Sequence, residues 1–396
     1  MKDANVKTIC VLTATRAEYG LLYPVICQIL EDPSLELKLV VSGTHLSEKY
    51  GFTVQEIRDD KIPIDAELDI LVEDECGKTN TSKTMAQALS VFSDYISKNS
   101  FDIAVILGDR YEMLAFALAL VNARVPIAHL NGGERTEGAL DEVYRHCITK
   151  ASSVHFANCE EHRRRIIQLG EIPETVFNVG DVCVDNVRLT KTISFDELKQ
   201  SLGFDNLNQK IVVVTFHPVT TGNNEDNLDE VLKALDEKSE YYYIITGANA
   251  DCGGDSYNLK LREYADSRGN SFFVNSLGRI RYLSLLKYTY MVMGNSSSGI
   301  YEVPIFKIPT INIGNRQKGR LHGTSVIDCE CEKKSILQAI DVAESEQFRF
   351  VCENTKNIFG DGTASKKIVN ILKQKLELGI KTEKEFYDIY MESKIG

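Results

Sequence analysis

The residues from Gly294 to Gly299, with the sequence GNSSSG, have the composition of a turn that binds a phosphate group. Glycines allow the backbone to come close to a ligand, and serine hydroxyls add hydrogen-bond donors without filling the space. Residues 290–293 predict a buried strand before this turn. A helix is expected to begin within it, so that free N–H groups and the helix dipole face the ligand. The alternative is a serine-rich helix cap, which does not need three consecutive hydroxyls.

Three further motifs suit a phosphate-containing ligand. Glu302 lies about one helical turn beyond the serine turn that holds Ser296 and Ser297, where a carboxylate can accept hydrogen bonds from ribose hydroxyls. Arg16 follows the first predicted strand and is equally suited to binding phosphate or to being a surface charge. Residues 316–320, RQKGR, bring three cations together and suit a diphosphate, with a solvated basic loop as the alternative.

Asp109 stands directly after a predicted strand and three residues before Glu112. An aspartate with this spacing to a glutamate fits a capping box at the start of an apolar helix. A carboxylate at a strand end can also act as a general acid or base toward a ligand bound there. We expect Asp109 to serve both purposes.

The turn after the next predicted strand is rich in carboxylates around the pair Gly132-Gly133. It carries Glu134, Glu137, Asp141 and Glu142. Some of these side chains would only solvate the loop or cap the next helix, and Asp141 can pair with Arg145 four residues later. The functional interpretation is a group of carboxylates whose environments give them different pKa values.

Two strand ends in the C-terminal half add candidate ligand contacts. His217 lies between a predicted strand and Pro218. The proline holds the backbone of His217 extended at the strand end, a position that is not typical of a core histidine. A second strand runs into residues 246–251, TGANAD, which include Asn249. In open parallel sheets, ligands bind at such carboxyl ends of strands.

The elements that must position these side chains alternate between apolar strands and amphipathic helices, which is the pattern of an α/β protein. The predicted strands are residues 8–13, 37–41, 101–107, 126–130, 211–216, 242–245, 272–275, 290–293 and 309–313. The clearest predicted helices are residues 19–31 and 111–122. A polar connector near 185–205 separates two Rossmann-like halves, and a last helix over about 365–385 is a candidate to pack on the first half. Neither half contains the GxGxxG fingerprint, which makes NAD a less favoured ligand.

Composition narrows the class of protein further. The 396 residues are enough for two domains, and a net charge of −12 argues against a general nucleic-acid binder. No run of about 18 apolar residues suggests a membrane span, and the polar first residues do not resemble a signal peptide. Ten cysteines without paired CxxC spacing favour reduced thiols in a cytoplasmic protein and give no zinc pattern.

Taken in order, these motifs resemble those of the UDP-N-acetylglucosamine 2-epimerases, specifically the hydrolysing branch that feeds sialic acid synthesis. The matching residues are Arg16-Ala17-Glu18-Tyr19, Gly108-Asp109-Arg110, His129 to Glu134, His217-Pro218, the serine turn with Glu302, and Ile311 to Arg320. The resemblance covers nearly the whole chain, and the ensemble is specific although each motif alone is not.

The resemblance implies a GT-B fold, in which two Rossmann-like parallel-sheet domains face a central cleft. Residues 1–185, joined by the C-terminal helix in residues 365–396, would bind the sugar and carry the catalytic carboxylates. Residues 186–364 would bind UDP. Relatives are commonly homodimers or homotetramers, and neither a metal nor any other cofactor is expected.

The implied reaction has two stages. UDP leaves C1 of UDP-N-acetylglucosamine as the C2 proton is removed, which gives a 2-acetamidoglucal. Water then adds across the double bond and yields N-acetylmannosamine with free UDP. The C2 proton is not next to a carbonyl, so its removal needs a cationic, oxocarbenium-like sugar that carboxylates stabilise.

The resemblance also assigns roles to individual residues. The expected catalytic residues are Asp109, Glu134, Asp141 and His217, the last near the diphosphate as a candidate acid for the leaving group. The expected substrate contacts are Arg16, Tyr19, Arg110, Asn131, Asn249, Ser296, Ser297, Glu302 and Arg316. Many relatives have a carboxylate where this chain has Asn131, which cannot act as a base. Glu134 is the nearest carboxylate and is the candidate for that role.

Several alternatives remain at this stage. A sister group hydrolyses UDP-N,N'-diacetylbacillosamine for legionaminic acid synthesis. The non-hydrolysing epimerases leave the bond between the sugar and UDP intact. A GT-B glycosyltransferase would share the nucleotide site but would need an acceptor. A non-enzymatic nucleotide-sugar sensor is disfavoured, because binding an anion gains nothing from so many carboxylates at residues 134–142.

Overall fold

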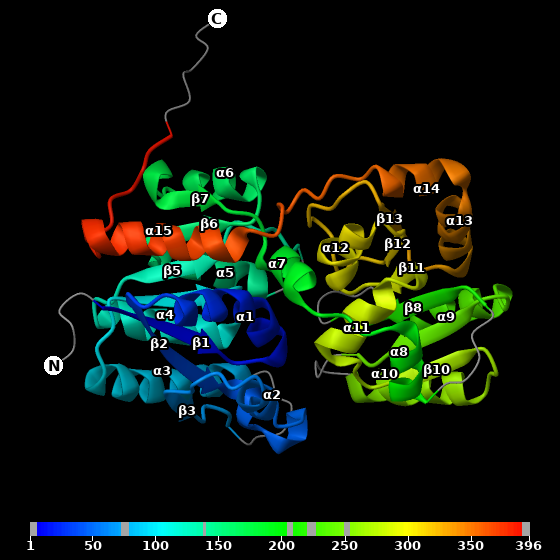
Figure 1. Cartoon of the computed structure of the whole chain (residues 1–396), viewed down its shortest axis with the longest axis horizontal. Coiled ribbons are helices and arrows are strands. Elements are labelled where there is room, and N and C mark those ends of the chain that lie inside the picture. Colours follow the sequence, from blue (N-terminus) through cyan, green and yellow to red (C-terminus); the bar gives the residue numbers. More distant parts are fainter. Residues whose placement is uncertain are drawn as a thin grey trace, which may run out of the picture. The chain divides into compact units, whose positions relative to one another are not determined.

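The computed structural model describes residues 6–72, 79–137, 140–203, 209–219, 227–248 and 254–389. Packing divides the chain into two compact units (Figure 1). Unit 1 comprises Met1–Glu134, Leu140–Asn186 and Phe359–Gly396. Unit 2 comprises Arg135–Ala139 and Val187–Ile358. The last segment of the chain therefore returns to the unit in which the chain began.

The described part of unit 1 forms a parallel sheet in the order β3-β2-β1-β4-β5-β6-β7. Its strands are β1 (Lys7–Thr13), β2 (Leu35–Ser42), β3 (Ala66–Leu68), β4 (Ile103–Leu107), β5 (Ile127–Leu130), β6 (Val154–Ala157) and β7 (Val176–Asn178). Its helices are α1 (Arg16–Glu31), α2 (Val54–Asp59), α3 (Asn80–Lys98), α4 (Tyr111–Asn122), α5 (Asp141–Ala151), α6 (Glu160–Gln168) and α15 (Ala364–Leu378). Helix α7 (Val182–Leu189) runs from unit 1 into unit 2, and short 3₁₀ turns lie at Gly43–Leu46, Glu48–Tyr50 and Pro173–Thr175.

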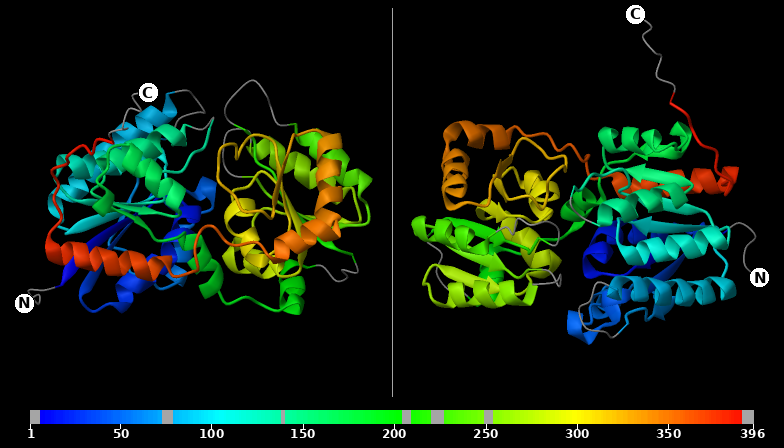
Figure 2. Two further views of the ribbon diagram at one scale, coloured as in Figure 1. Left: turned by 90° about the horizontal axis from the view of Figure 1, so that it is seen from above. Right: turned by 180° about the vertical axis from the view of Figure 1, so that it is seen from behind.

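The period of two along β1 places its side chains in two cores, one on each face of the sheet. Ile9 and Val11 pack in the core that contains α1 and α15, and Cys10 and Leu12 pack in the core that contains α3 and α4. Figures 1 and 2 show α15, in red, alongside α1. Asp185 accepts the backbone N–H groups of Ala364 and Ser365, so that it caps the start of α15.

The described part of unit 2 forms a second parallel sheet in the order β10-β9-β8-β11-β12-β13. Its strands are β8 (Ile211–Thr215), β9 (Tyr242–Thr246), β10 (Ser271–Val274), β11 (Thr289–Gly294), β12 (Thr310–Ile313) and β13 (Val326–Cys329). Its helices are α8 (Phe195–Leu202), α9 (Leu228–Glu237), α10 (Gly254–Asp266), α11 (Gly278–Leu286), α12 (Ser298–Tyr301), α13 (Lys333–Glu344) and α14 (Glu346–Glu353), with a 3₁₀ turn at Val303–Phe306. Apolar cores again lie on both faces of the sheet.

The prediction of two Rossmann-like parallel-sheet domains is confirmed. The prediction of helix boundaries is wrong at two ends. Helix α1 begins at Arg16 rather than at Tyr19, because Thr15 and Glu18 form a capping box there. Helix α15 ends at Leu378, before Gly379, rather than near 385. Four short strands that the sequence does not reveal, β3, β6, β7 and β13, extend the sheets toward their edges.

Candidate functional site

The two sheets share one topology, and it fixes where a ligand site is expected. Each has the order 3-2-1-4-5-6 when its first six strands are numbered within its own unit, which is the order of dinucleotide-binding folds. The order reverses between β1 and β4 in unit 1 and between β8 and β11 in unit 2. Arg16 and Asp109 follow the first pair of strands, and His217 and Ser296 follow the second pair. Asn249 lies outside the residues that the structure describes.

Arg16 is the first residue of α1 and is exposed at the turn after β1. Glu18 holds this turn in shape, because its Oε2 accepts from the N–H groups of Ala14 and Thr15 at 2.9 and 3.0 Å. Glu18 is only 6% exposed, and burial raises its pKa to about 7. Tyr19 lies in the core, and its hydroxyl donates a hydrogen bond to Asp60. Its contact with substrate stays a prediction.

Asp109, after β4, is held by a fully buried arginine of α5. The guanidinium of Arg145 donates to Asp109 through Nε at 3.1 Å and through Nη2, and to Glu142 at 2.6 Å. The predicted capping box is wrong, because α4 has Arg110 at its N-cap and no side-chain cap there. Glu112 instead accepts from Arg110 at 3.1 and 3.2 Å.

The Gly-Gly turn after β5 leaves no room for side chains. A Cβ atom on Gly132 would lie 3.0 Å from His129 Nδ1, and one on Gly133 would lie 2.4 Å from the carbonyl oxygen of His162. His129 is fully buried, and its Nε2 lies 2.8 Å from the carbonyl oxygen of Gly108, which joins the ends of β5 and β4. Burial lowers the pKa of His129 to about 3, so the ring is neutral and fixes the turn before Asp109.

Glu134 belongs to a buried polar network at the ends of β5, β6 and β7. The amide nitrogen of Asn158 donates to Glu134 at 2.8 Å and to Asp181 at 2.9 Å. Asn131 donates to the same oxygen of Asp181 at 3.2 Å. Arg145 also donates to the carbonyl oxygen of Glu134 at 3.1 Å. Arg145 therefore contacts the carboxylate of Asp109 and the backbone of Glu134, whereas the Glu134 carboxylate is held by Asn158.

Asp141 is the first residue of α5 and is half-buried. A carboxylate at this position favours the helix through the macrodipole, which is a structural reason for its presence beside any catalytic one. Its neighbour Glu142 contacts both Arg145 and His146. The sequence alone does not separate the roles of these adjacent carboxylates.

In unit 2, Asn295 locks the serine turn to the end of β8. Its side chain accepts from the N–H of His217 at 2.7 Å and donates to the carbonyl oxygen of His217 at 2.8 Å. Gly294, with a φ of 134°, is required because a Cβ there would lie 1.9 Å from the carbonyl oxygen of Thr215. Burial and the charge of Arg316 lower the pKa of His217 to about 3.

The serine turn leads into a short helix. Helix α12 has four residues, so its dipole contributes less than that of a full helix. Ser297 stands at its N-cap without a side-chain cap bond, but the hydroxyl of Ser296 accepts from the N–H of Ser298 at 3.4 Å, so the turn also has a capping role. Ser296 and Ser297 are half-buried, whereas the hydroxyl of Ser298 is bound to that of Tyr282. Glu302 follows the helix and is half-buried.

The basic loop after β12 lies against the serine turn. Arg316 and Gln317 both donate to the carbonyl oxygen of Asn295, at 3.1 and 2.8 Å. Arg320 donates to Thr136 at 3.3 Å, within the segment Arg135–Ala139 that belongs to unit 2. The residues predicted to hold a diphosphate are thus brought together in this unit.

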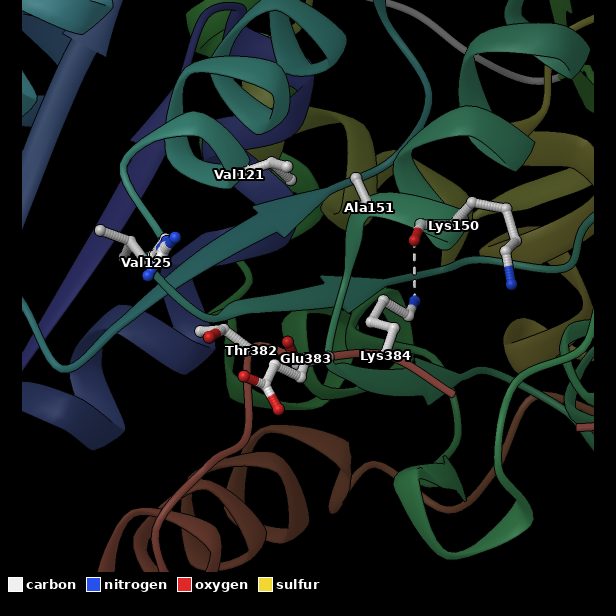
Figure 3. A pocket seen from close by; sticks show the side chains of 9 residues that line it. Val121, Val125, Lys150, Ala151, Thr382, Glu383 and Lys384 are labelled. Atoms are coloured by element: carbon white, nitrogen blue, oxygen red, sulfur yellow. Dashed lines mark hydrogen bonds between the residues drawn. The ribbon is translucent and has the colours of Figure 1, made fainter. Parts of the chain in front are cut away.

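A hollow of about 360 Å³ lies away from these strand ends, near the amino ends of β5 and β6 (Figure 3). It is lined by residues at and just after the C-terminal ends of α4 and α5 and by the segment after α15, including Lys150, Thr382 and Lys384. Lys384 donates to the carbonyl oxygen of Lys150 at 2.8 Å. Among the described residues, no group of three or more His, Cys, Asp or Glu is arranged to hold a metal, and no helix meets the length and hydropathy of a membrane span.

Asn158 and Asp181 are site residues that were not predicted from the sequence, and Arg145 was predicted only as a helix partner of Asp141. Asn158 directly follows β6, and Asp181 lies just beyond β7, two strands that were not predicted. Recognising the apolar runs 154–157 and 176–179 as strands would have placed both residues at strand ends.

A nucleotide-binding α/β protein is the class that this topology and these strand ends define. Residues 28–373 match the family described as UDP-N-acetylglucosamine 2-epimerase, and the chain belongs to this family.

Named relatives agree with this assignment. The chain is 36% identical to "Polysialic acid biosynthesis protein P7" from Escherichia coli, over 97% of this chain and 98% of the relative. It is 38% identical to "GDP/UDP-N,N'-diacetylbacillosamine 2-epimerase (hydrolyzing)" from Campylobacter jejuni, over 87% and 89%. The UDP-GlcNAc 2-epimerase of Neisseria meningitidis, solved with UDP-GlcNAc, has a TM-score of 0.81 at 18% identity and covers 93% of this chain and 100% of its own. This likeness confirms the GT-B-like fold.

Proposed function

We propose that the protein is a hydrolysing UDP-N-acetylglucosamine 2-epimerase, which converts UDP-GlcNAc and water to N-acetylmannosamine and UDP. The observation that carries the proposal is the linkage of strand-end carboxylates in unit 1 by Arg145, together with a turn suited to phosphate in unit 2. The name of the Campylobacter relative supports the hydrolysing branch.

The proposed first stage is an elimination. A carboxylate takes the proton from C2, the electron pair forms the C1–C2 double bond, and the C1–O bond breaks so that UDP departs. In the second stage, the hydroxyl group of a water molecule adds to C1. A proton adds to C2 on the face opposite to the one from which the first proton was removed. The products are N-acetylmannosamine and UDP, and no electrons are gained or lost.

Asp109, Glu134 and Asp141 are the proposed proton-transfer and charge-stabilising carboxylates. Asp109 accepts from the guanidinium of the buried Arg145, and a carboxylate held in this way is suited to stabilising positive charge on the sugar ring. Glu134, in a buried network with hydrogen-bonding amides, is suited to moving a proton. Arg110 and Asn131 are proposed substrate contacts beside them.

The proposed binding site for UDP uses Ser296, Ser297 and Arg316 for the diphosphate and Glu302 for the ribose. Arg16 and Asn249 are proposed as further contacts. His217 is neutral because burial and Arg316 lower its pKa, so it would donate a hydrogen bond to the departing diphosphate rather than act as a charged acid.

A second candidate substrate is UDP-N,N'-diacetylbacillosamine. Two relatives, from Campylobacter jejuni and Legionella pneumophila, carry this substrate in their names at 38% and 31% identity. The same elimination and hydration would apply, because the two sugars differ at C4 and C6 and react at C1 and C2.

The test is product analysis with each nucleotide sugar in deuterated water enriched in oxygen-18. We expect one deuterium at C2, oxygen-18 at C1 and one UDP for each sugar released. Recovery of UDP-ManNAc with its bond to UDP intact would replace this proposal by the non-hydrolysing reaction. Turnover only after an acceptor is added would identify a glycosyltransferase.

A further inference from the structure

Two buried carboxyl groups in unit 1 share one hydrogen-bond donor. Asn158 Nδ2 lies 2.8 Å from Glu134 Oε1 and 2.9 Å from Asp181 Oδ2. Glu134 is 6% exposed and Asp181 is 3% exposed. Two oxygens bound to the same nitrogen at these distances are at most about 6 Å apart, so two negative charges there repel each other with little water between them.

The orientation of the Asn158 amide is fixed by a third partner. Its Oδ1 lies 2.5 Å from His162 Nδ1, and His162 is 3% exposed. Burial lowers the pKa of His162, so the ring is neutral and its Nδ1–H donates to Oδ1. The amide nitrogen must therefore face the two carboxyl groups, since the opposite orientation would direct an oxygen at both of them.

Asp181 is also held from its other side. Its Oδ1 accepts from the N–H of Cys183 at 2.8 Å, and its own N–H donates to the carbonyl oxygen of Phe359 at 2.7 Å. Its Oδ2 accepts from Asn131 at 3.2 Å, which orients the amide of a predicted substrate contact. Asp181 therefore contacts Asn131 directly and reaches Glu134 through Asn158.

The groups around this pair give only limited compensation for two charges. Arg145 donates to the carbonyl oxygen of Glu134 and pairs with Asp109 and Glu142, and Arg165 donates to the carbonyl oxygen of Gly133. His162 is neutral, and burial raises the pKa of the Cys159 thiol. Burial, and then the charge of Glu134, also raise the pKa of Asp181.

We propose that Asp181 is a positioning residue: its carboxyl group and that of Glu134, which both accept from Asn158 Nδ2, hold one proton between them, and Asp181 so sets the protonation state of Glu134 during the reaction. This inference rests on the proposed function for its kinetic consequence. Coupled carboxyl groups lose their protons in two steps that belong to the pair. The pair can then hold one proton while the other carboxylate stays ionised.

The kinetic test compares the pH profile of kcat/KM for the wild type and Asp181→Asn. The amide keeps the size of the side chain and an oxygen for the N–H of Cys183. Removing one negative charge should move the Glu134-dependent limb to lower pH by about one unit. Asp102→Asn is the control, because Asp102 directly precedes β4, at the amino ends of the strands, whereas Asp181 follows β7 at the carboxyl ends, and because Asp102 accepts from the N–H of Thr8. Its profile should keep the wild-type shape.

A second measurement needs no turnover. Infrared spectra at neutral pH, with ¹³C-labelled aspartate or glutamate, should contain the carbonyl stretch of one protonated carboxyl in this pair. We expect Asp181→Asn and Glu134→Gln each to remove that band and Asp102→Asn to keep it. Glu18, another buried carboxyl, provides a band that remains in all variants below its pKa of about 7.

The outcomes separate the two proposals. If the wild type turns over neither nucleotide sugar, the proposed function is wrong and the infrared band alone decides the pairing. If turnover occurs but Asp181→Asn lowers kcat/KM equally at every pH and leaves the infrared band unchanged, Asp181 is only structural. A shifted limb with loss of the band supports the shared proton.

Discussion

A fully buried arginine such as Arg145 is stable only where acceptors neutralise its charge and satisfy its donors. Its partners are the carboxylates of Asp109 and Glu142 and the carbonyl oxygen of Glu134. The same bonds that stabilise Arg145 therefore fix the position of Asp109. This makes Asp109 a residue at which structural and catalytic roles must be separated by experiment.

For Asp109→Asn, we expect turnover to fall by about 10²- to 10⁴-fold, the usual contribution of a positioned acid or base. UDP affinity should be nearly retained, because Glu142 still pairs with Arg145 and unit 2 carries most of the proposed UDP contacts. Steady-state kinetics with calorimetric UDP titration checks both values. A collapse of UDP affinity together with a large fall in Tm would show that Asp109 serves the fold alone.

For Ser297→Ala, we expect UDP binding to weaken by about 0.5–1.5 kcal/mol, the value of one neutral hydrogen bond. The matched control is Ser298→Ala in the same turn, because the Ser298 hydroxyl is already bound to Tyr282. Calorimetric titration of both variants with UDP makes the comparison. Equal affinity in the wild type and Ser297→Ala would mean that this hydroxyl does not contact phosphate.

At the scale of elements, α15 illustrates how a helix distant in sequence completes a core. Ile368, Val369 and Leu372 pack in the same core as Leu22 and Val25 of α1. Lys373 also pairs with Asp32, which directly follows α1. The apolar face of α15 thus forms part of the hydrophobic core that covers one face of the N-terminal sheet.

Two leucines of α15 provide a matched pair of truncations. Leu372 is fully buried and Leu378 is 83% exposed. We expect Leu372→Ala to lower the free energy of unfolding by about 2–5 kcal/mol and Leu378→Ala to change it by about 0.5 kcal/mol or less. Urea denaturation of both variants measures this. Similar losses in the two variants would contradict the packing of α15 on unit 1.

At the scale of the whole molecule, neither unit is a simple half of the chain. Unit 1 needs Phe359–Gly396, whereas Val187–Ile358 forms most of unit 2. Removing residues 359–396 would expose the core beneath α15 but leave the second sheet complete.

For a chain truncated after Ile358, we therefore expect unit 1 to lose its protection from protease and unit 2 to keep it. Limited proteolysis with mass spectrometry should recover a fragment close to 187–358. The full-length chain should protect both units under the same conditions. Equal protection of both units in the truncated chain would contradict the division of the core.

The sequence predicted long central strands well, because β1, β4, β8 and β11 are continuous apolar runs with turn residues after them. It did not reveal β6 and β7, which have only a few residues and gain stability from pairing with neighbouring strands. It also assigned Asp109 to a helix cap from local spacing. The actual partner, Arg145, is 36 residues away and cannot be found from local spacing.

The sequence by itself determined the α/β class, the Rossmann-like repetition and the strand ends that carry polar motifs, because apolar periodicity and turn composition are local properties. Only the tertiary structure decided that Asp109, Glu134, Asn158 and Asp181 form connected networks around Arg145 and that α15 completes the first core. These contacts join segments far apart in the chain, and the strand order that brings them together is set by packing of the whole sheet.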